Sequence, residues 1–337
     1  MTIKDIAKLS GYGVGTVSRV INNQPGVSAR ARESILAIIK EQNFEPNENA
    51  RHLKRASSSS IAIIVKGTRN QMFAEIVIQL QSAFQVNGEN TSVFYIDEDV
   101  NEAEFALRLS REQNPKAFVF LGVNREHFTE NYAAIDAPGV IITNTSEGLA
   151  LDNLSSVTTP DEEAAKKATE YLVSMGHRKI GIIGGHSKGS QISEKRIRGA
   201  KKGLSENGIE FDNALQYIPS RFTSEDGYNA ANELLRRSPD VTAIFAIGDM
   251  IALGVIRAVV DGGKRVPDDI SVIGFDGLNM GEFSVPRLTT IVQNLGALVK
   301  SGVDIIMQRL EYDYHAVNIS APFSLMERES VRRIERK

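Results

Sequence analysis

The sequence contains no cysteine in its 337 residues, which excludes disulfide bonds, a thiol nucleophile and any metal site with cysteine ligands. It also lacks long apolar runs, since no stretch approaches the ~20 residues that a membrane-spanning helix needs. The N-terminus carries charged residues where an export signal would have an apolar core. By elimination, we expect a cytoplasmic protein that makes no contact with a membrane.

Signatures of catalysis are missing as well. No Gly-x-Ser-x-Gly nucleophile motif occurs, and the loop 184–190 departs from the residue order of a phosphate-binding loop. The five histidines do not have the spacing of metal ligands; they stand at positions 52, 127, 177, 186 and 315. We therefore expect neither an enzyme nor a resident metal or cofactor.

Charge is distributed unevenly along the chain. The first sixty residues hold nine Lys or Arg against five Asp or Glu, a net +4, whereas the remaining residues sum to −7. A basic end on an acidic body is typical of a protein that binds a polyanion through that end. Chance scatter could also produce an excess of four charges, so this pattern supports nucleic-acid binding without deciding it.

The first 46 residues show a helical pattern in three pieces. Thr2 and Asp5 resemble a capping box at the start of the first piece. The glycines of 11–13 interrupt the apolar spacing, which resumes and then stops at the breaker 22–26. Ser28 is a suitable N-cap for the third piece. Two short helices around a glycine-containing turn, closed by a third, predict a helix-turn-helix unit.

Residues 46–55 are followed by four consecutive serines, 57–60, which mark a linker. The stretch before the serines is long enough for one short helix only, and isolated helices of fewer than ~12 residues are marginal in water. We expect this hinge segment to become helical only against a partner.

After the linker, short apolar runs alternate with amphipathic helical stretches such as 161–175, which begins with three acids and is followed by Gly176. This alternation predicts an α/β fold with mostly parallel sheets and helices on both faces. The runs fall into two sets around residue 160, which favours two similar subdomains. The runs are 61–65, 92–96, 117–121, 140–143, 180–184, 243–247, 271–275 and 288–292.

A set of short motifs runs in order over nearly the whole chain. The motifs are 2–7 (TIKDIA), 16–22 (TVSRVIN), 27–28, 43–47 (NFEPN), 176–180 (GHRKI), 196–199 (RIRG), 249–254 (DMIALG), 273–276 (IGFD), 288–291 (LTTI) and 327–330 (ERES). Together they resemble the lactose/galactose-repressor (LacI/GalR) family. Each motif is weak alone, whereas the ordered set is specific.

The resemblance implies that residues 14–22 form a recognition helix in the major groove of DNA. Val14, Gly15 and Arg19 stand at the base-contacting positions, and Arg19 could pair with a guanine through two hydrogen bonds. Because Gly15 has no side chain and Val14 offers only an apolar contact, the operator sequence cannot be predicted. The other implied DNA contacts in this region are Thr2, Thr16, Ser18, Asn22 and Ser28.

The hinge segment matches the family's hinge helix, which implies three further DNA contacts. Leu53 stands where family members insert a leucine into the minor groove, and Ala50 is small enough for two hinge helices to pack closely. Asn49 completes the set. If this helix forms only on DNA, a change in the sensor domain that prevents its folding weakens DNA binding.

The remainder resembles periplasmic sugar-binding proteins, which implies an effector held between two subdomains. Charged groups beside an aromatic ring suit a sugar, because a sugar offers hydroxyls as well as an apolar C–H face. The implied effector-binding residues are Asn70, Phe73, Thr143, Arg196, Phe222, Asp249 and Asp276.

Two departures leave the effector open. Gly248 stands where sugar-responsive members usually carry Asn, and Thr143-Asn144 where many carry Asp. Purine-responsive members share a Gly before Asp249 and a Phe at position 222, but Ser190 replaces their ligand-binding arginine. We favour a sugar over a purine or a sugar phosphate.

Two other classes of protein fit less well. A sugar-binding transport protein would have an export signal and no basic headpiece, and a sugar-metabolising enzyme would need a catalytic constellation. We predict a repressor of carbohydrate-utilisation genes that binds a pseudo-palindromic operator as a homodimer. The expected domains are a headpiece (1–46), a hinge (47–60) and an effector-binding core (61–337). The core divides into an N-subdomain (about 61–159 and 291–318) and a C-subdomain (about 160–290 and 319–330).

Overall fold

The computed structural model describes residues 3–13, 16–17, 20, 27–41, 60–67, 70–128, 130–185, 191–312 and 315–335. The chain divides into two compact units, Met1–Ser58 and Ser59–Lys337. Most of the predicted hinge and the capping residue Thr2 lie outside the described residues.

The first unit is helical, as its apolar spacing predicts. Helix α1 spans Ile3–Ser10, helix α3 spans Ala29–Glu41, and residues 16, 17 and 20 are also helical. Its small core encloses Ile6, Val17 and Ile35 completely. The Thr16 and Val17 amides both donate to the Gly13 carbonyl, at 2.9 and 3.1 Å, which ties the helical residues 16 and 17 to the glycine turn.

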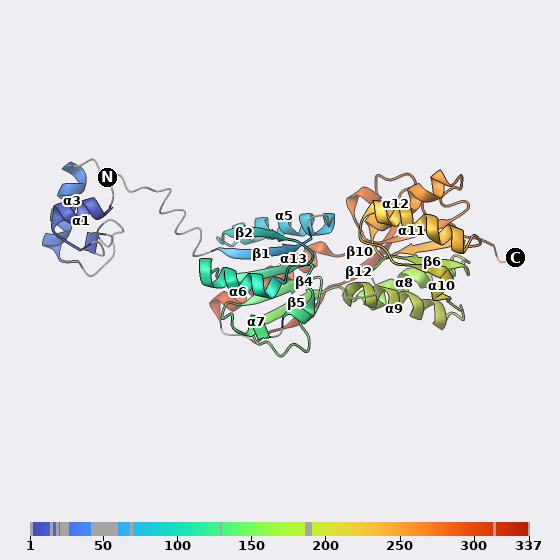
Figure 1. The fold of residues 1–337 in the computed structure, drawn as a ribbon, viewed down its shortest axis with the longest axis horizontal. Coiled ribbons are helices and arrows are strands. Elements are labelled where there is room, and N and C mark those ends of the chain that lie inside the picture. The colour runs from blue at the N-terminus through green and yellow to red at the C-terminus, as the bar shows by residue number, and fades with distance from the viewer. Residues whose placement is uncertain are drawn as a thin grey trace. The chain divides into compact units, whose positions relative to one another are not determined.

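The second unit contains two six-stranded sheets (Figure 1). The first sheet has the order β11-β5-β4-β3-β1-β2, and all its neighbouring strands are parallel. Its strands are β1 (Ile61–Lys66), β2 (Thr91–Ile96), β3 (Ala117–Leu121), β4 (Gly139–Ile142), β5 (Leu154–Thr158) and β11 (Asn318–Ser320). We call this sheet and its helices the first lobe.

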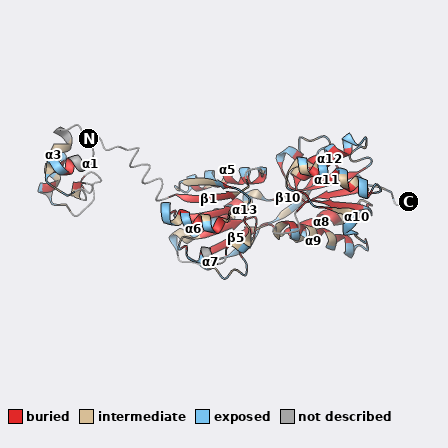
Figure 2. Ribbon diagram, viewed as in Figure 1, coloured by how far each residue is buried: buried red, intermediate tan, exposed pale blue. Residues whose placement is uncertain are grey.

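Alternation along β1 explains how helices cover both faces of the first sheet. Ile61, Ile63 and Val65 pack with α5 (Gln71–Val86) and α13 (Leu295–Glu311). Ala62 and Ile64 point to the other face and pack with α6 (Glu102–Gln113). Because both faces are covered there, β1 is apolar and buried from Ile61 to Val65 (Figure 2). Two short helices complete this lobe, η1 (Arg125–His127) and α7 (Glu130–Ala133).

The second sheet has the order β12-β10-β9-β8-β6-β7 and is parallel except for the pairing of β10 with β12. Figure 1 shows α8 and α9 on one face and α11 and α12 on the other; with this sheet they form the second lobe. The strands are β6 (Ile180–Ile183), β7 (Tyr217–Ile218), β8 (Ala243–Ala246), β9 (Ser271–Asp276), β10 (Thr289–Gln293) and β12 (Phe323–Met326). The helices are α8 (Asp161–Ser174), α9 (Gln191–Glu206), α10 (Asn213–Gln216), α11 (Ser224–Arg237), α12 (Asp249–Asp261) and η2 (Asn279–Gly281).

Glycines let α9 pack closely on α8 and let α12 pack closely on α11. A Cβ atom at Gly199 of α9 would lie 2.0 Å from the Glu162 carbonyl oxygen of α8, and one at Gly254 of α12 would lie 2.0 Å from the Ser224 carbonyl oxygen of α11. Any larger residue at either position would push the two helices apart, so the close spacing of each helix pair depends on its glycine.

The chain crosses between the two lobes in three places, namely between β5 and α8, between β10 and α13, and between β11 and β12. The crossing segments bond to one another. The Ala321 amide donates to the Thr158 carbonyl at 2.8 Å, and the Thr159 hydroxyl donates to Gln293 Oε1 at 2.7 Å. Each lobe is therefore built from separate stretches of sequence.

His177 follows α8 and is 1% exposed. Its Nδ1 lies 2.9 Å from the Thr242 hydroxyl and its Nε2 lies 3.2 Å from the Arg332 carbonyl. A neutral ring satisfies both contacts if Nε2–H donates to the carbonyl and Nδ1 accepts from the hydroxyl. Burial lowers the pKa of His177 to about 4, so the imidazole stays neutral at physiological pH.

Each of the eight predicted apolar runs overlaps a strand to within one residue at either end, and the predicted helix 161–175 corresponds to α8. The α/β fold with two helix-covered parallel sheets is confirmed. Strands β5, β7, β11 and β12 were not predicted. The four residues of β12 alternate between half-buried and exposed, and β11 is exposed throughout, so neither contains an apolar run.

Candidate functional site

Arg196 is the centre of a buried ion-pair cluster in the second lobe. It lies on α9 and is 3% exposed. Its Nε donates to Asp161 Oδ1 at 2.7 Å, and its Nη1 donates to Asp276 Oδ1 at 3.0 Å. Nη1 also donates to the carbonyl of residue 247 at 2.7 Å, and the guanidinium stacks 3.6 Å from the centre of the Phe275 ring. The planar group is thus fixed on its edge and on its face.

The charges of this cluster do not balance. Burial raises the pKa of Asp161 and of Asp276, while Arg196 lowers both. Burial also lowers the pKa of Arg196, but the two carboxylates outweigh this and raise it overall. With all three groups ionised, the cluster carries a formal charge of −1. Arg196 is therefore already committed to two carboxylates and is a poor partner for a further anion.

Asp276 ends strand β9 and has a φ angle of 114°, in the left-handed region that only Gly, Asn and Asp adopt readily. Among the described residues, both of its side-chain hydrogen bonds use Oδ1, which accepts from Arg196 and from Gln293 Nε2 at 2.8 Å. Two donors fill the lone pairs of that oxygen. Oδ2 accepts no hydrogen bond from the described residues, and its contact with a ligand stays a prediction.

Phe222 and Gly248 lie beside this free oxygen. A Cβ atom at Gly248 would lie 2.9 Å from Phe222 Cδ1 and 3.5 Å from Asp276 Oδ2. The absence of a side chain at position 248 therefore makes room for the aromatic ring next to the carboxylate. An aromatic face beside an acceptor is the arrangement that a hydroxylated ring with an apolar face requires.

Asp249 is the first residue of α12 and is fully enclosed. Its Oδ1 accepts from the Thr290 hydroxyl at 2.6 Å and its Oδ2 from the Leu278 amide at 2.7 Å. Burial, with a smaller contribution from Asp276, raises its pKa to about 8. Asp249 thus holds the loop that follows Asp276, and a direct contact with an effector stays a prediction.

The predicted residues of the first lobe lie at the ends of its elements. Asn70 caps α5, where its Oδ1 accepts from the Met72 amide at 3.0 Å. Phe73 follows in the first turn and is buried in the same apolar cluster as Leu278 of the second lobe. Met250, next to Asp249, packs against that cluster too. The two lobes therefore touch beside Asp276.

Thr143 follows strand β4 with a φ angle of 81°, which is unusual for a β-branched residue. Its hydroxyl is buried and has no hydrogen-bond partner among the described residues. A buried polar group without a partner costs free energy. This orphaned hydroxyl is available for a ligand, and the predicted contact of Thr143 with an effector stays a prediction.

The comparisons with known proteins agree with the fold. Residues 2–47 match the family described as bacterial regulatory proteins, lacI family, and residues 169–331 match the periplasmic binding protein-like domain. The transcriptional regulator MalR of Clostridium butyricum is 34% identical, over 98% of this chain and 99% of that protein. The chain belongs to the LacI family.

Two solved structures of transcriptional regulators resemble this one over nearly the full chain. The complex of the regulator CelR with cellobiose has a TM-score of 0.73 and 27% identity, and covers 98% of this chain and 99% of that one. The lac repressor dimer bound to operator and an anti-inducer has a TM-score of 0.74 and 25% identity, with the same coverage. The protein is thus a LacI-type DNA-binding regulator.

Only two of the predicted DNA contacts lie within the described residues. Thr16 begins the helical turn after Gly13, and Ser28 Oγ accepts from the Ala31 amide at 3.3 Å and so caps α3. The Ser28 hydroxyl proton remains available to a phosphate. The other predicted contacts lie outside the described residues; they are Thr2, Val14, Gly15, Ser18, Arg19, Asn22, Asn49, Ala50 and Leu53.

Sequence reasoning missed three residues of the second-lobe site. Asp161 was interpreted only as an acid at a helix start, although it is the closer of the two carboxylate partners of Arg196. Thr290 and Gln293 lie on a strand whose apolar run masked their polar contacts. Within the described residues, no group of acids and histidines could hold a metal ion, and no helix is long and apolar enough to cross a membrane.

Proposed function

We propose that this LacI-family protein is a cytoplasmic repressor of carbohydrate-utilisation genes, released from its operator by a neutral sugar. The observation that carries the proposal is the cluster of Arg196 with Asp161 and Asp276, flanked by Phe222. A sugar hydroxyl would donate to Asp276 Oδ2 while the Phe222 ring packs on the apolar face of the sugar. Phe73, Asn70 and the Thr143 hydroxyl would contact the sugar from the first lobe.

The charge of the cluster favours a neutral effector over a phosphorylated one. Arg196 already donates to Asp161 and Asp276, so a phosphate group next to it would have to compete with two carboxyl groups for the guanidinium. A neutral polyol has many hydroxyl donors and meets no such competition. The cellobiose complex of CelR is a precedent for a neutral sugar in this fold.

The DNA-binding half of the proposal follows the family resemblance. A headpiece of residues 1–46 would place Arg19, Val14 and Gly15 at the base edges, with Thr2, Thr16, Ser18, Asn22 and Ser28 on phosphates. A hinge of residues 47–60 would insert Leu53 into the minor groove, supported by Asn49 and Ala50. Two copies would bind a pseudo-palindromic operator, as the lac repressor dimer binds its operator.

A thermal-shift screen of the purified protein tests the effector class. The panel is cellobiose, ribose, glucose 6-phosphate and hypoxanthine. A ligand at 100 times its Kd adds about 2.7 kcal/mol to the stability of the folded state, which raises the melting temperature by roughly 5–10 °C. We expect a rise with a neutral sugar alone. A rise confined to the phosphate or the purine would contradict the effector assignment.

Selection of duplex DNA by the same protein tests the repressor assignment. We expect a pseudo-palindrome to be enriched, and the stabilising sugar to weaken its binding. A protein that enriches no sequence and ignores duplex DNA at low salt is not a repressor. Tighter binding with sugar would instead make the effector a corepressor and would contradict release.

A further inference from the structure

Gln293 joins three parts of the core through one side chain. It is the last residue of β10 and is buried at a crossing between the lobes. Its Nε2 donates to Asp276 Oδ1 at 2.8 Å and to Met72 Sδ of the first lobe at 3.2 Å. Its Oε1 accepts from the Thr159 hydroxyl, on a second crossing, at 2.7 Å.

The chemistry of its partners fixes the orientation of the amide. A carboxylate only accepts hydrogen bonds, so the NH2 group must face Asp276. One hydrogen of that group is used by Asp276 and the other by Met72, which leaves the carbonyl oxygen for Thr159. Every polar atom of the side chain is therefore engaged, and the amide cannot turn without losing bonds in both lobes.

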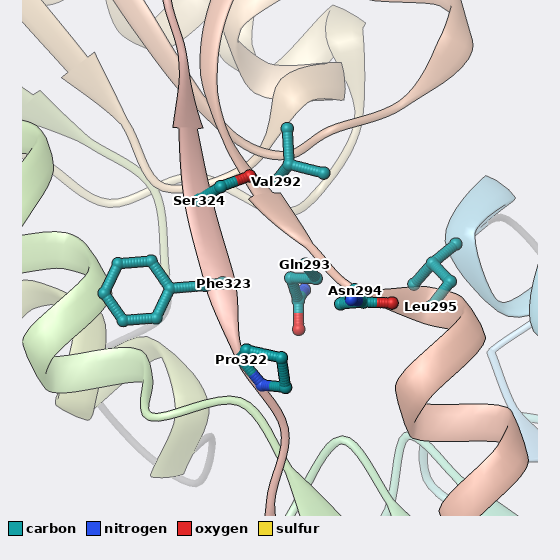
Figure 3. Close-up of a pocket in the computed structure, with 7 residues that line it drawn as sticks. All are labelled: Val292, Gln293, Asn294, Leu295, Pro322, Phe323 and Ser324. Carbon is teal, nitrogen blue, oxygen red and sulfur yellow. The ribbon is translucent and has the colours of Figure 1, made fainter.

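A cavity lies on the open side of the same crossing. It has a volume of about 430 Å³ and is lined by Val292–Leu295 and by Pro322–Ser324 (Figure 3). Its walls thus come from the crossing that contains Gln293 and from the crossing between β11 and β12. Unfilled space on this side leaves room for the two crossings to shift, whereas the Asp276 side of Gln293 is buried.

We propose that Gln293 is the positioning residue that couples occupancy of the effector site to the geometry of the crossings between the lobes. The proposal rests on the proposed function, since it describes how that site is regulated. A sugar that draws on Asp276 Oδ2 displaces the carboxylate that Gln293 holds. The amide transmits this displacement to Met72 in one direction and to Thr159 in the other. The relative setting of the lobes then changes, and with it the affinity for the operator.

Two variants test this role against a matched control. Gln293→Met keeps the length of the side chain and removes all three polar contacts. Thr159→Val keeps the shape of the residue and removes only the bond to Gln293. Gln308→Met makes the same chemical change on the exposed surface of α13 and serves as the control.

The measured quantity is the coupling ratio, which is the operator Kd with saturating sugar divided by the operator Kd without it. Cellobiose and ribose are the probes, and their own Kd values are measured by calorimetry. We expect Gln293→Met to lower the coupling ratio at least fivefold, toward one, while each separate affinity changes by less than about tenfold. Thr159→Val should lower the ratio in the same direction by a smaller factor, and Gln308→Met should leave it unchanged.

The outcomes separate this role from a purely structural one. A variant that melts earlier but keeps the wild-type coupling ratio overturns the proposal, and so does loss of sugar binding by Gln293→Met with an unchanged ratio in Thr159→Val. If Gln293→Met does not fold, the ratio of Thr159→Val decides. If operator binding by the wild-type protein responds to neither sugar, the result contradicts the proposed function and not the role of Gln293.

Discussion

The substitution Asp276→Asn removes one negative charge from the site and little else. Asn tolerates the φ angle of 114° at this position, and its carbonyl oxygen can still accept from Arg196 and Gln293. The atom that changes is Oδ2, which becomes an amide nitrogen and no longer accepts from a sugar hydroxyl. Hydrogen bonds to charged groups contribute about 1.5–3 kcal/mol, so we expect sugar binding to weaken by about 10- to 100-fold.

Asn is a better test than Ala at position 276 because Ala would also destabilise the fold. Asp276→Ala would leave the buried donors of Arg196 and Gln293 without this acceptor, at about 1–3 kcal/mol each. That loss is a large fraction of the 5–15 kcal/mol that typically stabilises a domain. Asp276→Ala should abolish the sugar response but also lower the melting temperature, whereas Asp276→Asn should lose sugar affinity with little change in melting temperature.

Calorimetry with the sugar and fluorescence anisotropy with a labelled operator provide the two readouts. Operator affinity without sugar should equal that of the wild-type protein within about threefold, because the substitution is confined to the effector site. Asp240→Asn, on the surface of the same lobe, is the control. Wild-type sugar affinity in Asp276→Asn would refute the assignment of Oδ2 as the ligand acceptor.

Three further predictions concern DNA reading, assembly and pH. Arg19→Ala should cost about 1–3 kcal/mol at a matched guanine and relax sequence preference while keeping weak, salt-sensitive binding, and unchanged operator selection would count against its role. Light scattering should find a homodimer on operator DNA; a monomer would contradict the two-fold arrangement. Because the pKa of His177 is about 4 in the folded protein and 6.5 in the unfolded chain, the unfolded chain binds the extra proton first as pH falls. Between pH 7.5 and pH 5, urea unfolding of the wild-type protein should therefore show a loss of about 2 kcal/mol relative to His177→Gln, in which the other titrating groups, Asp249 included, are unchanged.

The sequence predicted the buried strands well because they are covered on both sides. A run such as Ala117–Leu121 is apolar at every position, which leaves no ambiguity about its burial. Strand β5 is equally buried, yet its sequence, Leu-Ser-Ser-Val-Thr, is mostly polar. Ser156 is buried because its hydroxyl donates to Asn318, a partner that lies 162 residues away along the chain. The local sequence pattern around Ser156 cannot predict a contact with a residue so far along the chain.

The same limit applies to the site. Arg196 and Asp276 could be proposed because the family resemblance marks their positions. Asp161 and Gln293 could not, because their significance depends on the meeting of α8, α9 and the ends of β9 and β10 in space. The orphaned Thr143 hydroxyl likewise became visible only once its surroundings were known.

The three crossings between the lobes also determine when the core can be completed during synthesis. The first sheet takes its edge strand from residues 318–320 and one of its covering helices from residues 295–311. A nascent chain that has emerged as far as residue 290 therefore lacks strands or helices that each of the two lobes needs. Both sheets are complete only when the ribosome has delivered β12, residues 323–326, whereas helices α1 and α3 are synthesised before any strand of the two sheets.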